Sequence, residues 1–148
     1  MKFQMTVSFI SLVLSLAVPS VYGHGGTAVF DPEGNSDTFT ALVRITCFND
    51  GTGDAGYLVA RIRDNSLPME GLYLNMQILK GTQAISITDQ TPGDADYTPY
   101  VLLEGGNGVY TLMLNHTKAG SHTFDLEWHC MTLDNLHTGT DILVDQYH

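Results

Sequence analysis

Two alternating stretches joined by a short turn constrain the fold of this chain more than any other feature. Residues 108 to 130 read GVYTLMLNHTKAGSHTFDLEWHC. Large apolar side chains occupy the even-numbered positions on both sides of the turn, and the last even position is Cys130. A period of two residues is typical of half-buried β-strands, and Gly120 marks the turn between them. We therefore predict two strands whose even-numbered rows face the core.

The same alternation recurs along much of the chain. Further strands are predicted at 27–30, 38–48, 57–64, 72–78, 84–88, 97–104 and 140–147. Turns rich in Gly, Asp and Pro separate them, and the sequence GGNG at 105–108 predicts a tight hairpin. No segment repeats its apolar residues at helical spacing. These features predict an all-β, immunoglobulin-like antiparallel β-sandwich of about seven to nine strands.

The first 23 residues have the pattern of a secretory signal peptide. Lys2 precedes an apolar run of 12 residues, from 7 to 18, and small residues follow it. That run is shorter than the roughly 20 residues that span a bilayer as a helix. Cleavage after Gly23 would make His24 the first residue, and cleavage after Ser20 is the alternative. We predict a signal peptide at 1–23, one domain at 24–148, a secreted or periplasmic protein, and no stable membrane insertion.

The predicted mature chain is strongly acidic. It carries 5 basic and 16 acidic side chains, a net charge of −11 with histidine neutral. Nucleic acid is therefore not an expected partner, because its binding depends on Lys and Arg contacts to phosphate. The same charge attracts cations, although it also serves solubility in many secreted proteins.

Two cysteines in an exported chain predict one disulfide, Cys47–Cys130. Both residues lie on the apolar row of their predicted strand, and an oxidising compartment permits the bond. Closing a loop of this length stabilises a fold by about 4 to 5 kcal/mol in the chain-entropy model. Two buried free thiols are the alternative.

The stretch from 107 to 128 resembles a known structural element. A Gly-x-Tyr opening, an Ala-Gly turn and an alternating strand that ends in Cys130 are similar to the crossover between the two sheets of immunoglobulin-like domains. The stretch is also similar to filamin-type repeats and to small bacterial sandwich domains. This resemblance implies the fold and leaves the function open.

Histidine is the residue type that points to chemistry in this chain. The six histidines are His24, His116, His122, His129, His137 and His148. An N-terminal His24 would offer its α-amine and its imidazole to one Cu(II) ion, which favours nitrogen ligands. His116 and His122 end the core-facing rows beside the turn, so a first strand starting there would bring His24 close. We predict a copper site formed by His24 together with His116 or His122.

The other histidines have weaker patterns. His129 points away from the core row and is expected to pair with Glu127 or with solvent. His137 and His148, in a loop and at the C-terminus, are assigned no role. A β-sandwich whose mature chain starts with histidine resembles the small periplasmic copper carriers of the CopC type, and copper-dependent polysaccharide oxygenases share that N-terminal residue. These resemblances imply copper binding through His24.

Calcium is a second possible ligand. Asp31, Glu33, Asn35 and Asp37 alternate at the positions one, three, five and seven of a calcium loop. The looser acidic pairs at 50/54 and 94/96 belong to the same class. Ordinary turn chemistry explains all of these loops without a metal ion.

No combination of residues predicts an enzyme. Bridged cysteines leave no thiolate nucleophile, and the neighbours Ser121 and His122 point to opposite faces of a strand. We predict a non-catalytic binding protein, with Cu(II) as the first candidate ligand. A structural or adhesion module that contacts an extracellular protein is the main alternative, and an N-terminal-histidine oxygenase is a third.

Overall fold

The computed structural model describes residues 24–148, and the predicted signal peptide lies outside this range. Within it the regular structure consists of strands, and no helix there is long and apolar enough to cross a membrane. The strands are β1 (His24–Phe30), β2 (Ala41–Phe48), β3 (Tyr57–Asp64), β4 (Leu74–Lys80), β5 (Gln83–Asp89), β6 (Val101–Glu104), β7 (Gly108–His116), β8 (His122–Met131) and β9 (Gly139–Tyr147).

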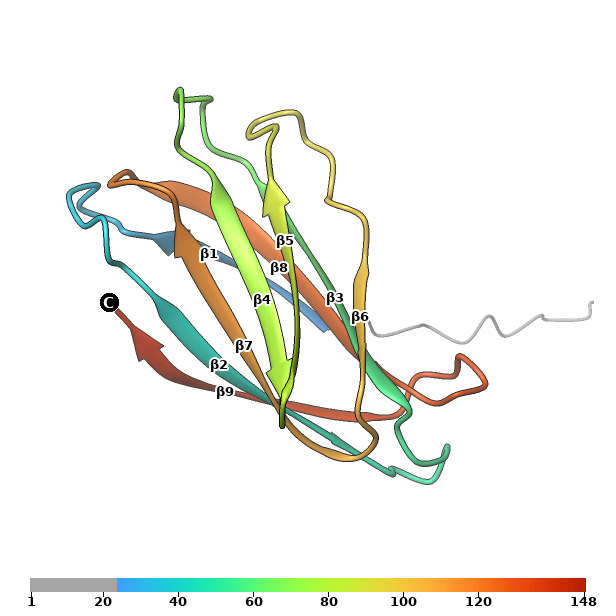
Figure 1. The fold of residues 1–148 in the computed structure, drawn as a ribbon. Helices are drawn as coiled ribbons and strands as arrows, with labels where there is room; N and C mark the ends of the chain where they lie inside the picture. The colour runs from blue at the N-terminus through green and yellow to red at the C-terminus, as the bar shows by residue number, and fades with distance from the viewer. Residues whose placement is uncertain (1–23) are drawn as a thin grey trace, which may run out of the picture.

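The strands form two antiparallel sheets that pack face to face (Figure 1). One sheet has the order β1-β8-β3-β6 and the other has the order β5-β4-β7-β2-β9. The predicted all-β sandwich is therefore confirmed, and its architecture is compatible with an immunoglobulin-like fold. Among residues 24–148, the edge strands are β1 and β6 in the first sheet and β5 and β9 in the second, and each pairs with a neighbouring strand on one side only.

The core lies between the two sheets, and the even-numbered rows face it as predicted. The buried even-numbered aliphatic and aromatic residues of β7 and β8, apart from two histidines, are Tyr110, Leu112, Leu114, Phe124, Leu126 and Trp128. Cys47 of β2 and Cys130 of β8 form a disulfide with a Cα–Cα distance of 5.5 Å. The predicted disulfide is confirmed, and it joins the two sheets through the core.

The structure corrects the prediction of a hairpin at 105–108. β6 pairs with β3 in one sheet, whereas β7 pairs with β2 and β4 in the other, so the connection crosses between sheets. Gly106 and Gly108 adopt positive φ values of 68° and 107°, which glycine accepts readily. Glycine-rich sequence predicts a sharp turn correctly, but it does not reveal which sheet the next strand joins.

The direction of β1 decides where the histidines lie. β1 runs antiparallel to β8, with His24 opposite Trp128 and Phe30 opposite His122. The first strand thus ends, rather than starts, beside His122. It also begins at His24 and not at Thr27, because it continues through Gly25 and Gly26, which carry no side chains to produce an alternating pattern.

Candidate functional site

Three imidazole rings gather at the start of β1. The ring centroids of His24 and His137 are 5.0 Å apart, those of His129 and His137 are 5.5 Å apart, and those of His24 and His129 are 6.3 Å apart. We call these three residues the outer histidine cluster. All three are half-buried, so the cluster can be reached from solvent.

The loop after β8 brings His137 back to this place. His137 forms an isolated antiparallel bridge with Met131 at the end of β8. The next residue, Thr138, is fully buried and its hydroxyl group lies 2.7 Å from the carbonyl oxygen of Gly53 and 3.1 Å from that of Phe48. Its backbone N–H donates to the carbonyl oxygen of Cys130 at 2.9 Å. These bonds hold the loop, and with it His137, against β8.

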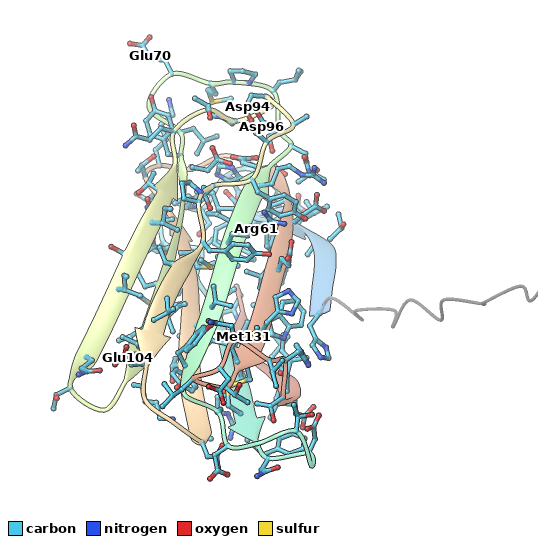
Figure 2. All side chains as sticks on the ribbon, turned by 90° about the vertical axis from the view of Figure 1, so that its right-hand side faces the viewer. Arg61, Glu70, Asp94, Asp96, Glu104 and Met131 are labelled. Atoms are coloured by element: carbon cyan, nitrogen blue, oxygen red, sulfur yellow. A yellow bond between two sulfur atoms is a disulfide. The ribbon has the colours of Figure 1, made fainter. Side chains whose placement is uncertain are left out.

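A polar network on the outer face of the same sheet orients His129. Its Nε2 atom lies 3.1 Å from the Glu127 carboxylate, which is one of the two partners predicted for it, solvent being the other. Arg61 donates two further hydrogen bonds to Glu127 at 2.7 and 2.9 Å, and Tyr100 donates another. The Arg61 guanidinium also packs on the rings of Tyr97 and Tyr100, each centroid 4.3 Å away, and Figure 2 shows Arg61 midway along this face. A neutral His129 that donates from Nε2 keeps its lone pair on Nδ1.

The charge states of the cluster favour metal binding. Burial lowers the pKa of His24, and the neighbouring His129 lowers it further. The pKa of His137 is lowered first by burial and then by His24 and His129. The His137 Nε2 atom is buried without a hydrogen-bond partner among residues 24–148. Imidazole binds metal ions in its neutral form, and both lowered pKa values preserve that form at pH 7.

The predicted partners of His24 lie at the other end of β1. His116 and His122 have ring centroids 5.4 Å apart, and we call them the inner histidine pair. His24 is six positions along β1 from Phe30, the residue opposite His122, which corresponds to about 20 Å at about 3.3 Å per residue. The structure therefore brings His116 and His122 together and keeps His24 away from both, because β1 runs in the direction opposite to the one assumed.

The first acidic loop closes a turn with its own carboxylate. Asp31 is buried and accepts backbone N–H groups of Asn35, Ser36 and Gly120 at 3.3, 3.2 and 3.1 Å. Burial alone would raise the pKa of Asp31, but these hydrogen bonds lower it below its ordinary value. Asp31 thereby ties the connection between β1 and β2 to the connection between β7 and β8. Calcium binding by this loop stays a prediction.

The spacing of the outer cluster suits a shared ion, although its rings would have to turn. In the part of the chain that the structure describes, no group of three or more His, Cys, Asp or Glu side chains is placed to hold a metal ion as it stands. Imidazole nitrogens bind metal ions at about 2.0 Å, so two rings that share an ion have centroids about 5 to 6 Å apart. The spacings of 5.0 and 5.5 Å lie within this range and that of 6.3 Å, between His24 and His129, lies just above it. Side-chain rotation can redirect the nitrogens and shorten this last distance.

Comparison with known proteins adds no information about the site. Neither the family models, nor the curated proteins, nor the solved structures compared with this chain contain a match to it. Sequence reasoning singled out His24 and missed His129 and His137 as its neighbours. The pairing of His24 with Trp128 places His129 nearby, but that register is visible only in the folded chain.

Proposed function

We propose that the protein is an exported, non-catalytic binding protein that holds one Cu(II) ion in the outer histidine cluster. The observation that supports this proposal is the grouping of three imidazole rings within 6.3 Å of one another. It keeps His24 as the central ligand and replaces its predicted partners, His116 and His122, by His129 and His137.

The donor set fits the chemistry of Cu(II). This ion favours tetragonal coordination by nitrogen ligands. If cleavage leaves His24 first, its α-amine and imidazole form a chelate, and His129 and His137 complete a set of four nitrogens. The acidic chain, with a formal net charge of −10 before cleavage, attracts a divalent cation.

The Glu127 network supplies the outer support that metal-bound histidines usually have. A ligand histidine commonly donates its second ring N–H to a carboxylate, which fixes its tautomer and orientation. Glu127 provides this contact to His129 at 3.1 Å, and Arg61 holds Glu127 in turn. Burial alone would raise the pKa of Glu127, but hydrogen bonds from Tyr100, Arg61 and His129 lower it. The carboxylate therefore stays ionised when the metal binds.

Titration of the exported protein with Cu(II) tests the proposal. We expect one ion per chain, and we expect His137→Ala and His129→Ala each to weaken binding by at least about 100-fold, more than the loss of an outer-shell contact. The exposed His148 supplies the matched control, and His148→Ala should bind like the parent protein. A single residue added before His24 removes the chelate and should weaken binding as well. Equal affinity in all variants would contradict the proposal.

A structural or adhesion module is a second candidate, favoured by the edge strand β9. Its neighbouring residues Ile142, Leu143 and Val144 have exposed fractions of 37%, 53% and 55%, and β9 pairs on one side only. Such an edge can accept a strand from another chain. The resemblance to filamin-type repeats agrees with this role. Light scattering tests it: assembly that persists without metal and disappears in Leu143→Lys supports the module, and a monomer at all concentrations opposes self-assembly through β9.

A further inference from the structure

We propose that the inner histidine pair is a second metal site, which binds one monovalent copper ion, Cu(I), between two imidazole nitrogens. This proposal is independent of the outer histidine cluster. The pair lies where β7 ends and β8 begins, at the end of the sandwich where β1 also ends (Figure 1). His116 and His122 are 8% and 1% exposed, which makes them the two most enclosed histidines of the described residues.

Hydrogen bonds fix which nitrogen of each ring carries the proton. His116 Nε2 lies 2.7 Å from the carbonyl oxygen of Ser36, which can only accept, so Nε2 is the donor. His122 Nδ1 lies 2.6 Å from the Asp64 carboxylate, so Nδ1 is the donor. When both rings are neutral, the lone pairs lie on His116 Nδ1 and His122 Nε2. A backbone carbonyl and a carboxylate are the partners that metal-bound histidines use to orient their rings.

These two lone-pair nitrogens have no hydrogen-bond partner in the part of the chain that the structure describes. His116 Nδ1 and His122 Nε2 are both buried without a hydrogen bond among residues 24–148. Buried polar atoms are nearly always hydrogen-bonded, because leaving them unpaired is unfavourable. Two imidazoles that bind one ion from opposite sides at about 2.0 Å have centroids about 6 Å apart, so the rings of His116 and His122, with centroids 5.4 Å apart, would separate slightly to take such an ion.

The number of protein side chains that can act as ligands indicates which kind of metal ion the inner histidine pair can bind. Zn²⁺ in a structural site takes four protein ligands, whereas no third His, Cys, Asp or Glu of the described residues completes this group. The Phe30 ring packs against the pair, 5.0 Å from His116 and 6.2 Å from His122, and limits access by water. Cu(I) is a closed-shell ion that accepts two nitrogen donors, and imidazole suits copper. The carboxylate of Asp64, which is hydrogen-bonded to His122, compensates the single positive charge of Cu(I).

Silver titration followed by NMR of the histidine ring nitrogens tests this site. Ag(I) has the charge and the low coordination number of Cu(I) and does not change oxidation state under these conditions. The purified protein should carry His24→Ala and His137→Ala, so that the outer cluster does not compete. We expect one Ag(I) per chain and large ¹⁵N shifts at His116 Nδ1 and His122 Nε2. His116→Gln should weaken binding at least about 100-fold, whereas His148→Gln should have no effect.

Two results would overturn the proposal. In the first, Ag(I) leaves the ¹⁵N signals of both rings unchanged. In the second, the metal-free protein shows one ring protonated on both nitrogens and sharing a proton with the other ring, and Ag(I) does not displace that proton. If His116→Gln fails to fold, the ¹⁵N shifts of the protein with the intact pair decide alone. Cu(II) titration without the outer substitutions tests the outer cluster separately.

Discussion

The two groups of histidines differ in what holds their rings. The outer histidine cluster takes one residue from the start of β1, one from the outward-facing row of β8 and one from the loop after β8. Among residues 24–148, only His129 of the three has a hydrogen-bond partner for its ring. The inner histidine pair is enclosed, and each of its rings is held by a buried or backbone oxygen. Outer rings can therefore reorient at little cost, whereas inner rings are part of the core. We expect substitutions in the outer cluster to affect Cu(II) binding with little effect on stability, and substitutions in the inner pair to lower stability while leaving Cu(II) binding unchanged.

The largest effect should come from His122→Ala. This change removes the 2.6 Å contact to Asp64 and leaves a carboxylate that is 0% exposed without its main partner. Breaking a buried pair in this way costs about 3 to 5 kcal/mol. Urea unfolding should show this loss, while His129→Ala should lower the free energy of unfolding by about 1 kcal/mol or less. Equal losses in the two variants would erase the distinction between inner and outer histidines.

A smaller effect on stability, combined with an effect on binding, is expected for Thr138→Val. Valine keeps the shape of the buried Thr138 but removes the hydroxyl group that lies 2.7 Å from the carbonyl oxygen of Gly53 and 3.1 Å from that of Phe48. Such a loss costs about 1 to 3 kcal/mol. Because Thr138 anchors the loop that carries His137, we also expect Cu(II) affinity to fall. Thermal unfolding and Cu(II) titration of the same sample measure both, and unchanged affinity would show that the loop does not position His137.

The free energy of unfolding, measured as the pH is lowered, should distinguish the outer cluster from the inner pair. The pKa values of His24 and His137 are lowered from 6.5, and the pKa of Asp64 is lowered from 3.8. Burial alone would raise the pKa of Asp64, but hydrogen bonds from His122 and Ser66 lower it. In each case the folded protein binds fewer protons than the unfolded chain. Stability should therefore fall in two steps, below pH 6.5 and again below pH 3.8.

Each contributing group changes stability by at most about 1.4 kcal/mol per pH unit. Combined His24→Ala and His137→Ala should reduce the step below pH 6.5. Asp64→Asn should reduce the step below pH 3.8 without abolishing it, because the pKa values of Asp31 and Asp125 are lowered as well. Asp141→Asn, on the exposed side of β9, serves as the control. Urea unfolding from pH 7.5 to 3 measures these slopes. If stability falls in a single step, and only the histidine substitutions or only Asp64→Asn change it, the assignment of two steps to these groups would be contradicted.

The smallest effect on stability is expected for His24→Ala alone. His24 begins an edge strand and is half-buried, and its ring makes no hydrogen bond to the described residues. Substitutions of this kind change stability by about 0.5 kcal/mol or less. Affinity for Cu(II) should nevertheless fall by at least about 100-fold. A large loss of stability would show that His24 is a structural residue of β1.

The sandwich could be predicted from sequence because its strands carry local patterns. The alternating rows at 110–114 and 124–130 and the two cysteines on apolar rows define the core and the disulfide without knowledge of the sheets. The crossing at Gly105 to Gly108 was not predictable in the same way. A glycine-rich turn has the same local chemistry whether it joins two strands of one sheet or two strands of different sheets.

The candidate site could be predicted only in part. His24 stood out because of its place after the predicted signal peptide, and Glu127 was one of the two partners predicted for His129, with solvent as the other. The proximity of His129 to His24 depends on the register of β1 against β8, which is set by tertiary packing. His137 reaches the cluster through a loop whose anchor, Thr138, bonds to residues about 85 to 90 positions away. Neither contact leaves a local signal in the sequence.

Pulsed EPR of the Cu(II)-loaded exported protein is the most direct test of the proposed copper site, because it counts the imidazole rings bound to the ion. We predict three coupled imidazoles, falling to two in His137→Ala and in His129→Ala, and remaining three in His116→Gln. A spectrum that is unaffected by His137→Ala and His129→Ala but changes in His116→Gln would contradict the account, since it would place Cu(II) at the inner pair.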